Sequence, residues 1–245
     1  MMNFKLTLQY DGSRYKGWQR LGQDEETIQG KIEHVLSRLE GEPVEIVGSS
    51  RTDAGVHALG QVVSVKLTKV KSAADLKHDL NHALPQDMAV VEVTDVPERF
   101  HARYQAKGKT YLYQIWNAEH VQPFLRKYSM HVEQPLALDR MRAAASELTG
   151  THDFTAYSNV KSKKKTTVRT IDMITVTEKE GLIAIRLHGN GFLYNMARKM
   201  VGTLIDAGLG TIEPATIPAI LEAQDRSCTG RLAEARGLFL ESVDF

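Results

Sequence analysis

The order in which apolar periodicity changes along the chain restricts the fold more than any single residue does. Residues 4–10 alternate between apolar and polar, which indicates a strand with one buried face. From about Thr27, apolar residues recur at helical spacing as far as Gly41, a residue that commonly ends helices. After this helix the pattern predicts strands at 44–47 and 61–67, a helix at 73–84 and a strand at 88–93. This is the β-α-β-β-α-β order of the split ferredoxin-like unit.

The second half of the chain repeats this order with additions. Gly150 is expected to end a helix, and Glu180-Gly181 to turn a hairpin. We therefore expect an α+β fold of two ferredoxin-like or RRM-like units, residues 1–104 and 105–245. Helices on one face of each mainly antiparallel sheet would leave the other faces free to join around a central cleft. The elements predicted in this half are strands at 109–116, 127–132, 170–177, 182–187 and 238–243, and helices at 139–148, about 192–207 and about 215–222.

Composition narrows the class of protein. Of the 245 residues, 42% are hydrophobic and 25% are charged, which is ordinary for a globular protein. No apolar run is long enough to span a bilayer, and residues 1–5 lead into a strand without signal-peptide features, so we expect a soluble cytoplasmic protein. The single cysteine, Cys228, excludes an internal disulfide framework and a multi-thiolate metal site. A net charge of +1 argues mildly against a nucleic-acid partner unless the charges are segregated onto different faces.

The segment Arg51-Thr52-Asp53-Ala54-Gly55-Val56-His57 places one carboxylate in a loop between two predicted strands. A lone carboxylate with a guanidinium two residues before it favours covalent or electrostatic catalysis over general acid–base catalysis by two carboxylates. Taken alone, Asp53 in such a segment is more often a turn residue that bonds to its own loop. A metal site built on Asp53 and His57 is a weaker alternative, because no further ligand cluster lies near them in the sequence.

Arg198 stands in a predicted helix that is apolar over most of its circumference and is therefore expected to be buried. A buried arginine needs a carboxylate or a ring of acceptors, because an unpaired buried charge is costly. The sequence does not name that partner, and a purely structural ion pair is the more common outcome.

Tyr111 and Tyr113 are expected on the same face of one strand. Core packing is the usual role of aromatic residues in strands. The specific alternative is stacking on an extruded base, since RNA-binding sheets use aromatic residues in this way.

Basic residues gather between positions 159 and 169. A lysine run is most often a solvated loop, and the functional alternative is an arm that follows phosphates. The basic residues of this segment are Lys161, Lys163, Lys164, Lys165 and Arg169. Cations near the predicted strand ends, each best interpreted singly as surface charge, are Arg14, Lys16, Arg20, Arg99 and Arg103.

A set of short motifs follows in order from residue 10 to near the C-terminus. They are Tyr10-Asp11-Gly12-Ser13-x-Tyr15-x-Gly17-Trp18-Gln19-Arg20, Arg51-Thr52-Asp53-Ala54-Gly55-Val56-His57-Ala58, Gly60-Gln61-Val62-Val63, Phe100-His101-Ala102-Arg103, Tyr111-x-Tyr113, Gly189-x-Gly191-Phe192-Leu193-Tyr194-x-Met196-x-Arg198-x-x-Val201-Gly202 and Gly237-Leu238-x-Leu240-x-x-Val243. Together they resemble the tRNA pseudouridine synthase A family over essentially the whole chain. The motif around Asp53 is highly specific, whereas the others would be weak alone.

The resemblance implies an isomerase that converts uridines at positions 38 to 40 of the tRNA anticodon stem-loop to pseudouridine, without cofactor or metal. Asp53 would be the essential aspartate and Arg198 the arginine that pairs with it. Tyr111 would lie against the target base and Arg51 would assist its extrusion, with Arg103 a further substrate-binding candidate. The cleft would then bind RNA, and the protein would be a homodimer in which each tRNA contacts both subunits. Ser50 departs from the family, which generally has glycine there, so a positive φ is not expected at this position.

The chemistry of this reaction suits a lone carboxylate. The base must leave the helix, and a carboxylate can then attack either C1′ of the ribose or C6 of the uracil; the sequence does not decide between them. A second carboxylate that activated water would produce hydrolysis instead. Two alternatives stay open, a non-catalytic RNA-binding module and a metal-dependent phosphoester hydrolase built on Asp53 and His57.

Overall fold

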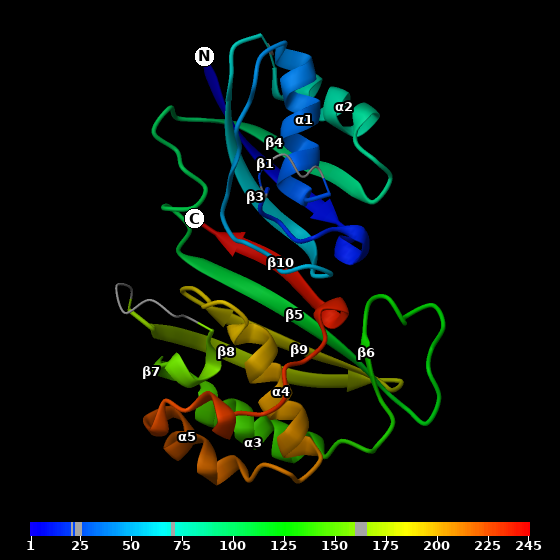
Figure 1. Cartoon of the computed structure of the whole chain (residues 1–245), viewed down its shortest axis with the longest axis vertical. Coiled ribbons are helices and arrows are strands. Elements are labelled where there is room, and N and C mark those ends of the chain that lie inside the picture. Colours follow the sequence, from blue (N-terminus) through cyan, green and yellow to red (C-terminus); the bar gives the residue numbers. More distant parts are fainter. Residues whose placement is uncertain (21, 23–25, 70–71, 160–165) are drawn as a thin grey trace. The chain divides into compact units, whose positions relative to one another are not determined.

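The computed structural model describes residues 1–20, 22, 26–69, 72–159 and 166–245 (Figure 1). Within these ranges the chain forms two compact units, of which the first comprises Met1–Lys107 with Phe239–Phe245 and the second Gly108–Leu238. Each unit combines helices with a mainly antiparallel sheet, so the expected α+β class is confirmed. No helix of the described ranges has the length and apolar character needed to cross a membrane.

The sheet of the first unit has the order β4-β1-β3-β10. β1 runs antiparallel to both β3 and β4, whereas β10 runs parallel to β3. The helices α1 (Ile28–Glu40) and α2 (Ala73–Ala83) lie side by side against this sheet (Figure 1). The strands are β1 (Met2–Tyr10), β3 (His57–Leu67), β4 (Met88–Val96) and β10 (Leu238–Asp244), with the two-residue β2 (Val47–Gly48) paired to β3.

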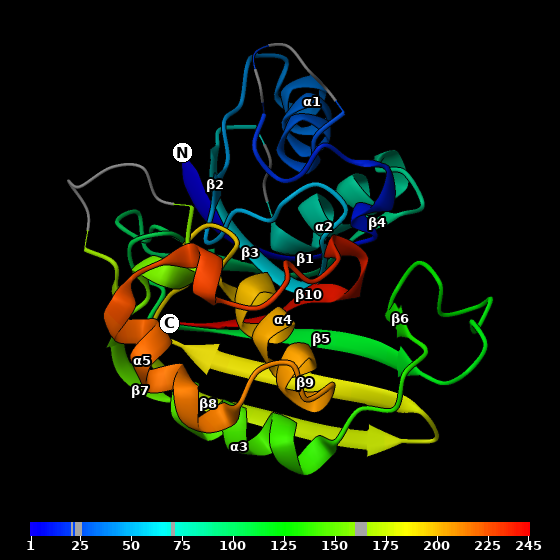
Figure 2. The ribbon, with the colours of Figure 1, turned by 60° about the horizontal axis from the view of Figure 1, so that its bottom comes forward.

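The sheet of the second unit has the order β5-β9-β8-β7, in which each neighbouring pair is antiparallel, and β6 pairs in parallel with β5. The helix α3 (Leu138–Leu148) packs against β8 and against the other two helices, α4 (Met196–Gly208) and α5 (Ile217–Ala223) (Figure 2). The strands are β5 (Gly108–Asn117), β6 (Met130–Val132), β7 (Gly150–Asp153), β8 (Val168–Lys179) and β9 (Leu182–Gly189).

The helix ends of the first unit follow capping signals in the sequence. Thr27 Oγ1 accepts a hydrogen bond from Gly30 N at 3.2 Å, and Gly41 ends α1 with a φ of 71°. Ser72 Oγ caps α2 by accepting from Asp75 N at 3.1 Å. Such caps satisfy backbone groups that the helix itself leaves unpaired. The predictions of these two helices are confirmed.

The predicted strand at 44–47 is wrong over most of its length, since only Val47 belongs to a strand. The alternating pattern was real, because Val44 and Ile46 are buried. Their backbone groups, however, bond to side chains of α1: Ile46 N donates to Glu33 Oε1 at 3.0 Å and Val44 N to Ser37 Oγ at 2.9 Å. Burial of alternate residues therefore does not require a strand partner.

Three element ends in the second unit also differ from the predictions. The helix expected from about 192 begins at Met196, because Asn195 has a φ of 63° and cannot continue a right-handed helix. Thr149 caps α3, and Gly150, with a φ of 120°, instead begins β7, a strand that was not predicted. The last helix starts at Ile217, after a short 3-10 helix at Pro214–Thr216. The hairpin turn at Glu180-Gly181 is confirmed by positive φ angles of 53° and 81°.

Candidate active-site residues

Asp53 lies in a tight turn between β2 and β3. Val56 N donates to Asp53 O at 3.1 Å, and Gly55 between them has a φ of 78°. A turn of this form needs a positive φ at its third residue, which glycine adopts without strain. Asp53 is half-buried, whereas Arg51 is exposed. The non-glycine residues of positive φ in the described ranges do not include Ser50, as expected from its side chain.

Thr52, immediately before Asp53, is fixed from two sides by the last residue of β1 and by the segment that follows this strand. Its hydroxyl forms a buried hydrogen bond of 2.8 Å with Tyr10 Oη, and its carbonyl accepts from Trp18 N at 2.9 Å. At Gly17, with a φ of 98°, a Cβ would stand 2.9 Å from Thr52 O, closer than real Cβ contacts. The segment 10–18 thus lies directly on the turn and holds its backbone, a role that its motif did not predict.

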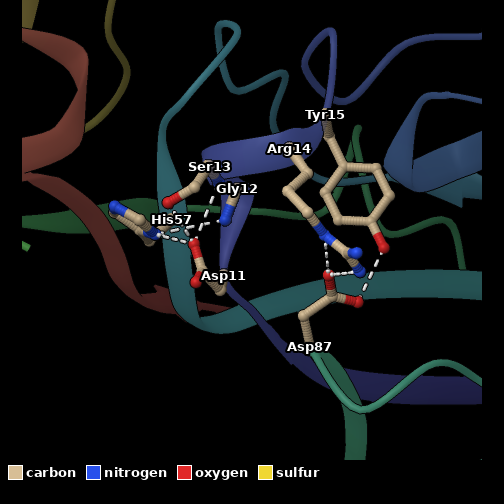
Figure 3. A network of polar contacts seen from close by, with 7 residues as sticks. All are labelled: Asp11, Gly12, Ser13, Arg14, Tyr15, His57 and Asp87. Carbon is tan, nitrogen blue, oxygen red and sulfur yellow. Dashed lines mark hydrogen bonds and ion pairs between the residues drawn. The ribbon is translucent and has the colours of Figure 1, made fainter. Parts of the chain in front are cut away.

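The end of the turn is fixed through Gly12 and His57 (Figure 3). Gly12 N donates to His57 Nδ1 at 3.1 Å, and a Cβ on Gly12 would overlap the Val56 carbonyl. The His57 ring is 1% exposed and stacks on Phe239 of β10 with ring centroids 4.7 Å apart. His57 belongs to β3, so these contacts tie the turn to the rigid sheet.

Asp11 adds a third group to this cluster. Its Oδ1 lies 3.2 Å from the same His57 Nδ1, and it accepts from Ser13 N at 2.9 Å and Ser13 Oγ at 2.6 Å. One ring nitrogen cannot accept from Gly12 and donate to Asp11 at once. Because the Gly12 N–H is a buried, fixed donor and Asp11 already receives two hydrogens, we assign Nδ1 as the acceptor and the ring proton to Nε2.

Asp87 clamps the other end of the same segment, the 3-10 helix η1 (Gly12–Arg14) and its flanks (Figure 3). Its carboxylate accepts from Tyr15 Oη at 2.7 Å and from Arg14 Nε at 3.0 Å, and pairs with Arg14 Nη2. Its backbone carbonyl accepts from Asp11 N at 2.9 Å. Burial, followed by the bond to Asp87, raises the pKa of Tyr15 above its ordinary value. The segment that supports the Asp53 turn is therefore fixed at both ends.

In the second unit, Tyr111 and Tyr113 have different environments on one face of β5. The Tyr111 ring meets Phe192 edge-on, with centroids 4.9 Å apart and planes at 78°. Tyr113 is fully buried and donates to Glu234 O at 2.9 Å, and its burial raises its pKa. Core packing, the usual role, is confirmed for Tyr113.

Arg198 is half-buried in the first turn of α4. Its Nε donates to Ala233 O at 2.7 Å, and Ala233 N donates to Arg198 O at 3.2 Å. An arginine in this helix was expected to need hydrogen-bond acceptors, and the backbone carbonyl of Ala233 is one such acceptor. Pairing of Arg198 with Asp53 stays a prediction.

The other predicted cations have varied positions. Arg103 is exposed, and its backbone N donates to His101 Nδ1 at 3.2 Å. The lysines of the basic segment lie at 160–165, outside the described residues. Arg169, at the end of that segment, donates from Nη1 to Thr166 O at 3.0 Å and to Val168 O at 2.6 Å, and burial lowers its pKa.

The metal alternative used Asp53 and His57. His57 Nδ1 accepts the Gly12 N–H, so this nitrogen is engaged inside the protein. Across the part of the chain that the structure describes, no three His, Cys, Asp or Glu side chains gather as metal ligands would.

Comparison with known proteins extends over both units. A family model described as tRNA pseudouridine synthase matches residues 7–105 and 144–245. A tRNA pseudouridine synthase A from Bacillus sp. (strain KSM-64) is 59% identical over 245 residues, and a tRNA pseudouridine synthase A 2 from Bacillus cereus is 55% identical, each covering 100% of both chains. A solved archaeal box H/ACA sRNP Nop10–Cbf5 complex aligns with 84% of this chain and 42% of its own at 12% identity, with a TM-score of 0.37 that is too low to bear on the fold. The chain belongs to the tRNA pseudouridine synthase family.

Proposed function

We propose that this protein isomerises uridine to pseudouridine at positions 38, 39 and 40 of the tRNA anticodon stem-loop. Its relatives of 59% and 55% identity over the full length are named tRNA pseudouridine synthases. The structural observation that most supports the proposal is the turn at Asp53, where Trp18 and Tyr10 bond to the neighbouring Thr52 and where the segment 51–57 offers one acidic residue. A rigid turn that presents one carboxylate suits a nucleophile that must meet one atom of a bound base.

In this proposal Asp53 is the nucleophile, and Arg198 pairs with it and keeps it ionised. A guanidinium near a carboxylate lowers the pKa of the acid, and both C1′ and C6 attack require the ionised form. Tyr111 lies against the target base, beside Phe192. Arg51 assists base extrusion and Arg103 binds the substrate, roles that their exposed side chains permit.

The reaction follows from these roles. Extruding the base costs a few kcal/mol, part of which stacking by an inserted side chain offsets. Asp53 forms a bond to C6 before, or to C1′ during, cleavage of the bond between N1 and C1′. The uracil rotates, C5 bonds to C1′, and the bond to Asp53 breaks, which regenerates the carboxylate. A proton acceptor then takes the C5 proton, and N1 gains a proton. The uracil keeps all its other atoms, so the reaction needs neither water nor an oxidant. A site without a second carboxylate to activate water favours this rearrangement over hydrolysis.

The proposal includes the organisation of the protein. Two ferredoxin-like units, residues 1–104 and 105–245, join around a central RNA-binding cleft. The protein acts in the cytoplasm as a homodimer, without cofactor or metal, on tRNA that contacts both subunits. The helices and the mainly antiparallel sheet within each unit are consistent with a ferredoxin-like organisation of the units taken singly.

The test is release of tritium from 5-tritiated uridine in unmodified tRNA. The wild-type protein should release tritium from positions 38 to 40 and leave pseudouridine there, with no free uracil and no loss of rate in a chelator. Asp53→Ala should release none while still binding tRNA. An RNA-binding module would release no tritium even as wild type, and a metal-dependent hydrolase would lose its activity in chelator; either result rejects the proposal.

A further inference from the structure

Residues 229–233, here called the strap, pass along α4 without regular secondary structure (Figure 2). The strap joins the region after α5 to the last strand, and Arg198 lies on the helix beside it. Its contacts with α4 are polar, closely spaced and largely buried, which is unusual for a connecting segment on a protein surface.

Side chains at helical spacing on α4 hold the strap. Lys199 Nζ donates to Thr229 Oγ1 at 2.9 Å and to Gly230 O at 2.8 Å, and only 8% of Lys199 is exposed. Thr203, four residues on, accepts from Gly230 N at 3.1 Å. Residues four apart lie on one face of a helix, so these bonds form a row beneath the strap.

Asp206 continues this row at the next turn of α4. It accepts from Arg231 N at 2.8 Å and from Arg231 Nε at 2.6 Å, and it is 7% exposed. A carboxylate that binds both the backbone and the side chain of one residue fixes the position of that residue closely.

Two glycines let the backbones of the strap and α4 approach. A Cβ on Gly202 would overlap the Arg231 carbonyl, and a Cβ on Gly230 would stand 2.6 Å from Thr203 Cα. The strap therefore has little room to move toward the helix, and the bonds of Lys199 and Asp206 prevent it from moving away.

The strap ends in the two hydrogen bonds between Ala233 and Arg198. A guanidinium is planar, so a bond from Nε to a fixed carbonyl sets the direction in which both terminal nitrogens point. Ala233 is fully buried, and the next residue, Glu234, accepts from Tyr113 at 2.9 Å. The acceptor of Arg198 is thus held on both sides.

We propose that the strap orients the Arg198 guanidinium for reaction, and that Lys199 and Asp206 are positioning residues that act through it. This inference rests on the proposed function, in which Arg198 pairs with the nucleophile. The two buried charged side chains of α4 are otherwise unexplained, because an apolar row would pack the strap at a lower desolvation cost. The charged side chains of Lys199 and Asp206 hold the strap in one position, and the strap in turn holds the Arg198 guanidinium in one direction.

Lys199→Met tests the proposal, because it keeps the apolar stem of the side chain and removes both strap bonds. We expect kcat for tritium release to fall about 10- to 100-fold, as for a catalytic group displaced by a fraction of an ångström to one ångström. KM should not change, since the guanidinium would contribute to the transition state. Lys199→Arg, which can donate to the same two acceptors, should restore most of the rate.

The matched control is Arg140→Met. Arg140 also holds backbone carbonyls at and just beyond the end of α4, donating to Ala207 O at 2.9 Å and to Ile212 O at 3.2 Å. Its ion-pair partner is Glu213, which also lies outside the strap. The Arg140→Met substitution should lower the thermal midpoint about as much as Lys199→Met does, but should leave kcat at the wild-type value. An equal loss of kcat in both variants would show that Lys199 acts only through stability and would overturn the inference.

A second variant covers the case in which Lys199→Met does not fold. Thr229→Val removes one acceptor from the strap and should lower kcat severalfold with KM unchanged. A folded Lys199→Met or Thr229→Val protein with wild-type kcat overturns the inference, even though the wild type releases tritium and Asp53→Ala does not. If the wild type itself releases no tritium, the proposed function fails instead.

Discussion

The turn that carries Asp53 and the helix that carries Arg198 are held in different ways. The groups that bond directly to the turn are neutral: Tyr10 on the Thr52 hydroxyl, Trp18 on its carbonyl, and Gly12 on His57. The ion pair of Arg14 with Asp87 acts one step away, on the segment that carries these groups. Arg198 sits on a regular helix, and its side chain is directed by a strap that charged groups hold.

The difference follows from what each element supplies by itself. A turn has few backbone bonds of its own, so its neighbours must fix the backbone, and they do so by close approach and short neutral bonds. A helix fixes its own backbone, so only the direction of a long side chain has to be set from outside. The two candidate site residues are therefore held differently: close approach and neutral hydrogen bonds fix the Asp53 turn, and buried charged side chains fix the strap to which Arg198 bonds.

The largest expected loss of stability comes from adding a Cβ at Gly12 or Gly202, the glycines that let backbone segments approach closely. Gly12→Ala drives a Cβ into the Val56 carbonyl, and Gly202→Ala drives one into the Arg231 carbonyl. Each should lower the free energy of unfolding by about 3 kcal/mol, the upper end for overpacking, because a backbone atom cannot rotate away. Urea denaturation measures the effect.

Gly191→Ala is the control for these substitutions, since its Cβ would stand 3.6 Å from the Arg169 side chain, an ordinary contact. Its unfolding free energy should stay within about 1 kcal/mol of wild type. If Gly12→Ala is as stable as Gly191→Ala, the segment 10–18 does not lie against the turn as closely as described.

A smaller effect should follow from breaking the bond between Tyr10 and Thr52. Thr52→Val keeps the shape of the side chain but removes its hydroxyl, and it should cost about 1–2 kcal/mol. Because the hydroxyl holds the turn, kcat for tritium release should fall more than tRNA affinity does. The double variant Tyr10→Phe/Thr52→Val should cost less than the sum of the two single changes, because both partners of one bond are removed together. Additive costs would mean that the two hydroxyls are not coupled.

The smallest effect should come from Tyr15, at the far end of the supporting segment. Tyr15→Phe removes a hydrogen bond to Asp87 and should cost about 1 kcal/mol at neutral pH. Because the pKa of Tyr15 is raised in the folded protein, the unfolded chain loses this proton first as the pH rises. The stabilisation that the Tyr15 hydroxyl contributes is therefore complete below pH 10, the ordinary pKa of tyrosine. It is lost progressively as the pH rises from there through the raised pKa of Tyr15 in the folded protein.

The measurement is the free energy of unfolding of wild type and Tyr15→Phe between neutral pH and pH 11. The free energy of unfolding should decrease at alkaline pH less steeply in the variant than in the wild type. Some decrease should remain, because burial also raises the pKa of Tyr157 to about 12 and that of Tyr113 further. Equal slopes in the two proteins would show that Tyr15 is not bonded to Asp87 in solution.

Much of the fold was predictable because it depends on local signals. Thr27, Gly41 and Ser72 cap helices through their own chemistry, and the positive φ angles at Glu180 and Gly181 belong to a hairpin turn. The predicted strand at 44–47 failed because the partner of its backbone is the Glu33 side chain, which no periodicity reveals.

The candidate site was predictable only as a set of residues. The motifs singled out Asp53, Tyr111 and Arg198, but gave no reason for Gly12 or Gly17, whose role is to leave space for the turn. The residues of the strap themselves had no signal in the sequence, because they have no periodicity and the partners of Thr229 and Gly230 lie about 30 positions earlier on α4. A lysine and an aspartate in the apolar repeat of that helix were the only local indication.

The role of Asp53 is tested most directly by the rate of tritium release from saturating 5-tritiated tRNA with Asp53→Asn. The asparagine has nearly the same shape as aspartate and should leave the turn intact, but its amide is not a nucleophile of comparable strength. We expect tRNA binding to be kept and the rate to fall at least about a thousandfold. A rate within about tenfold of wild type, in a folded protein that binds tRNA, would contradict a nucleophilic role for this carboxylate.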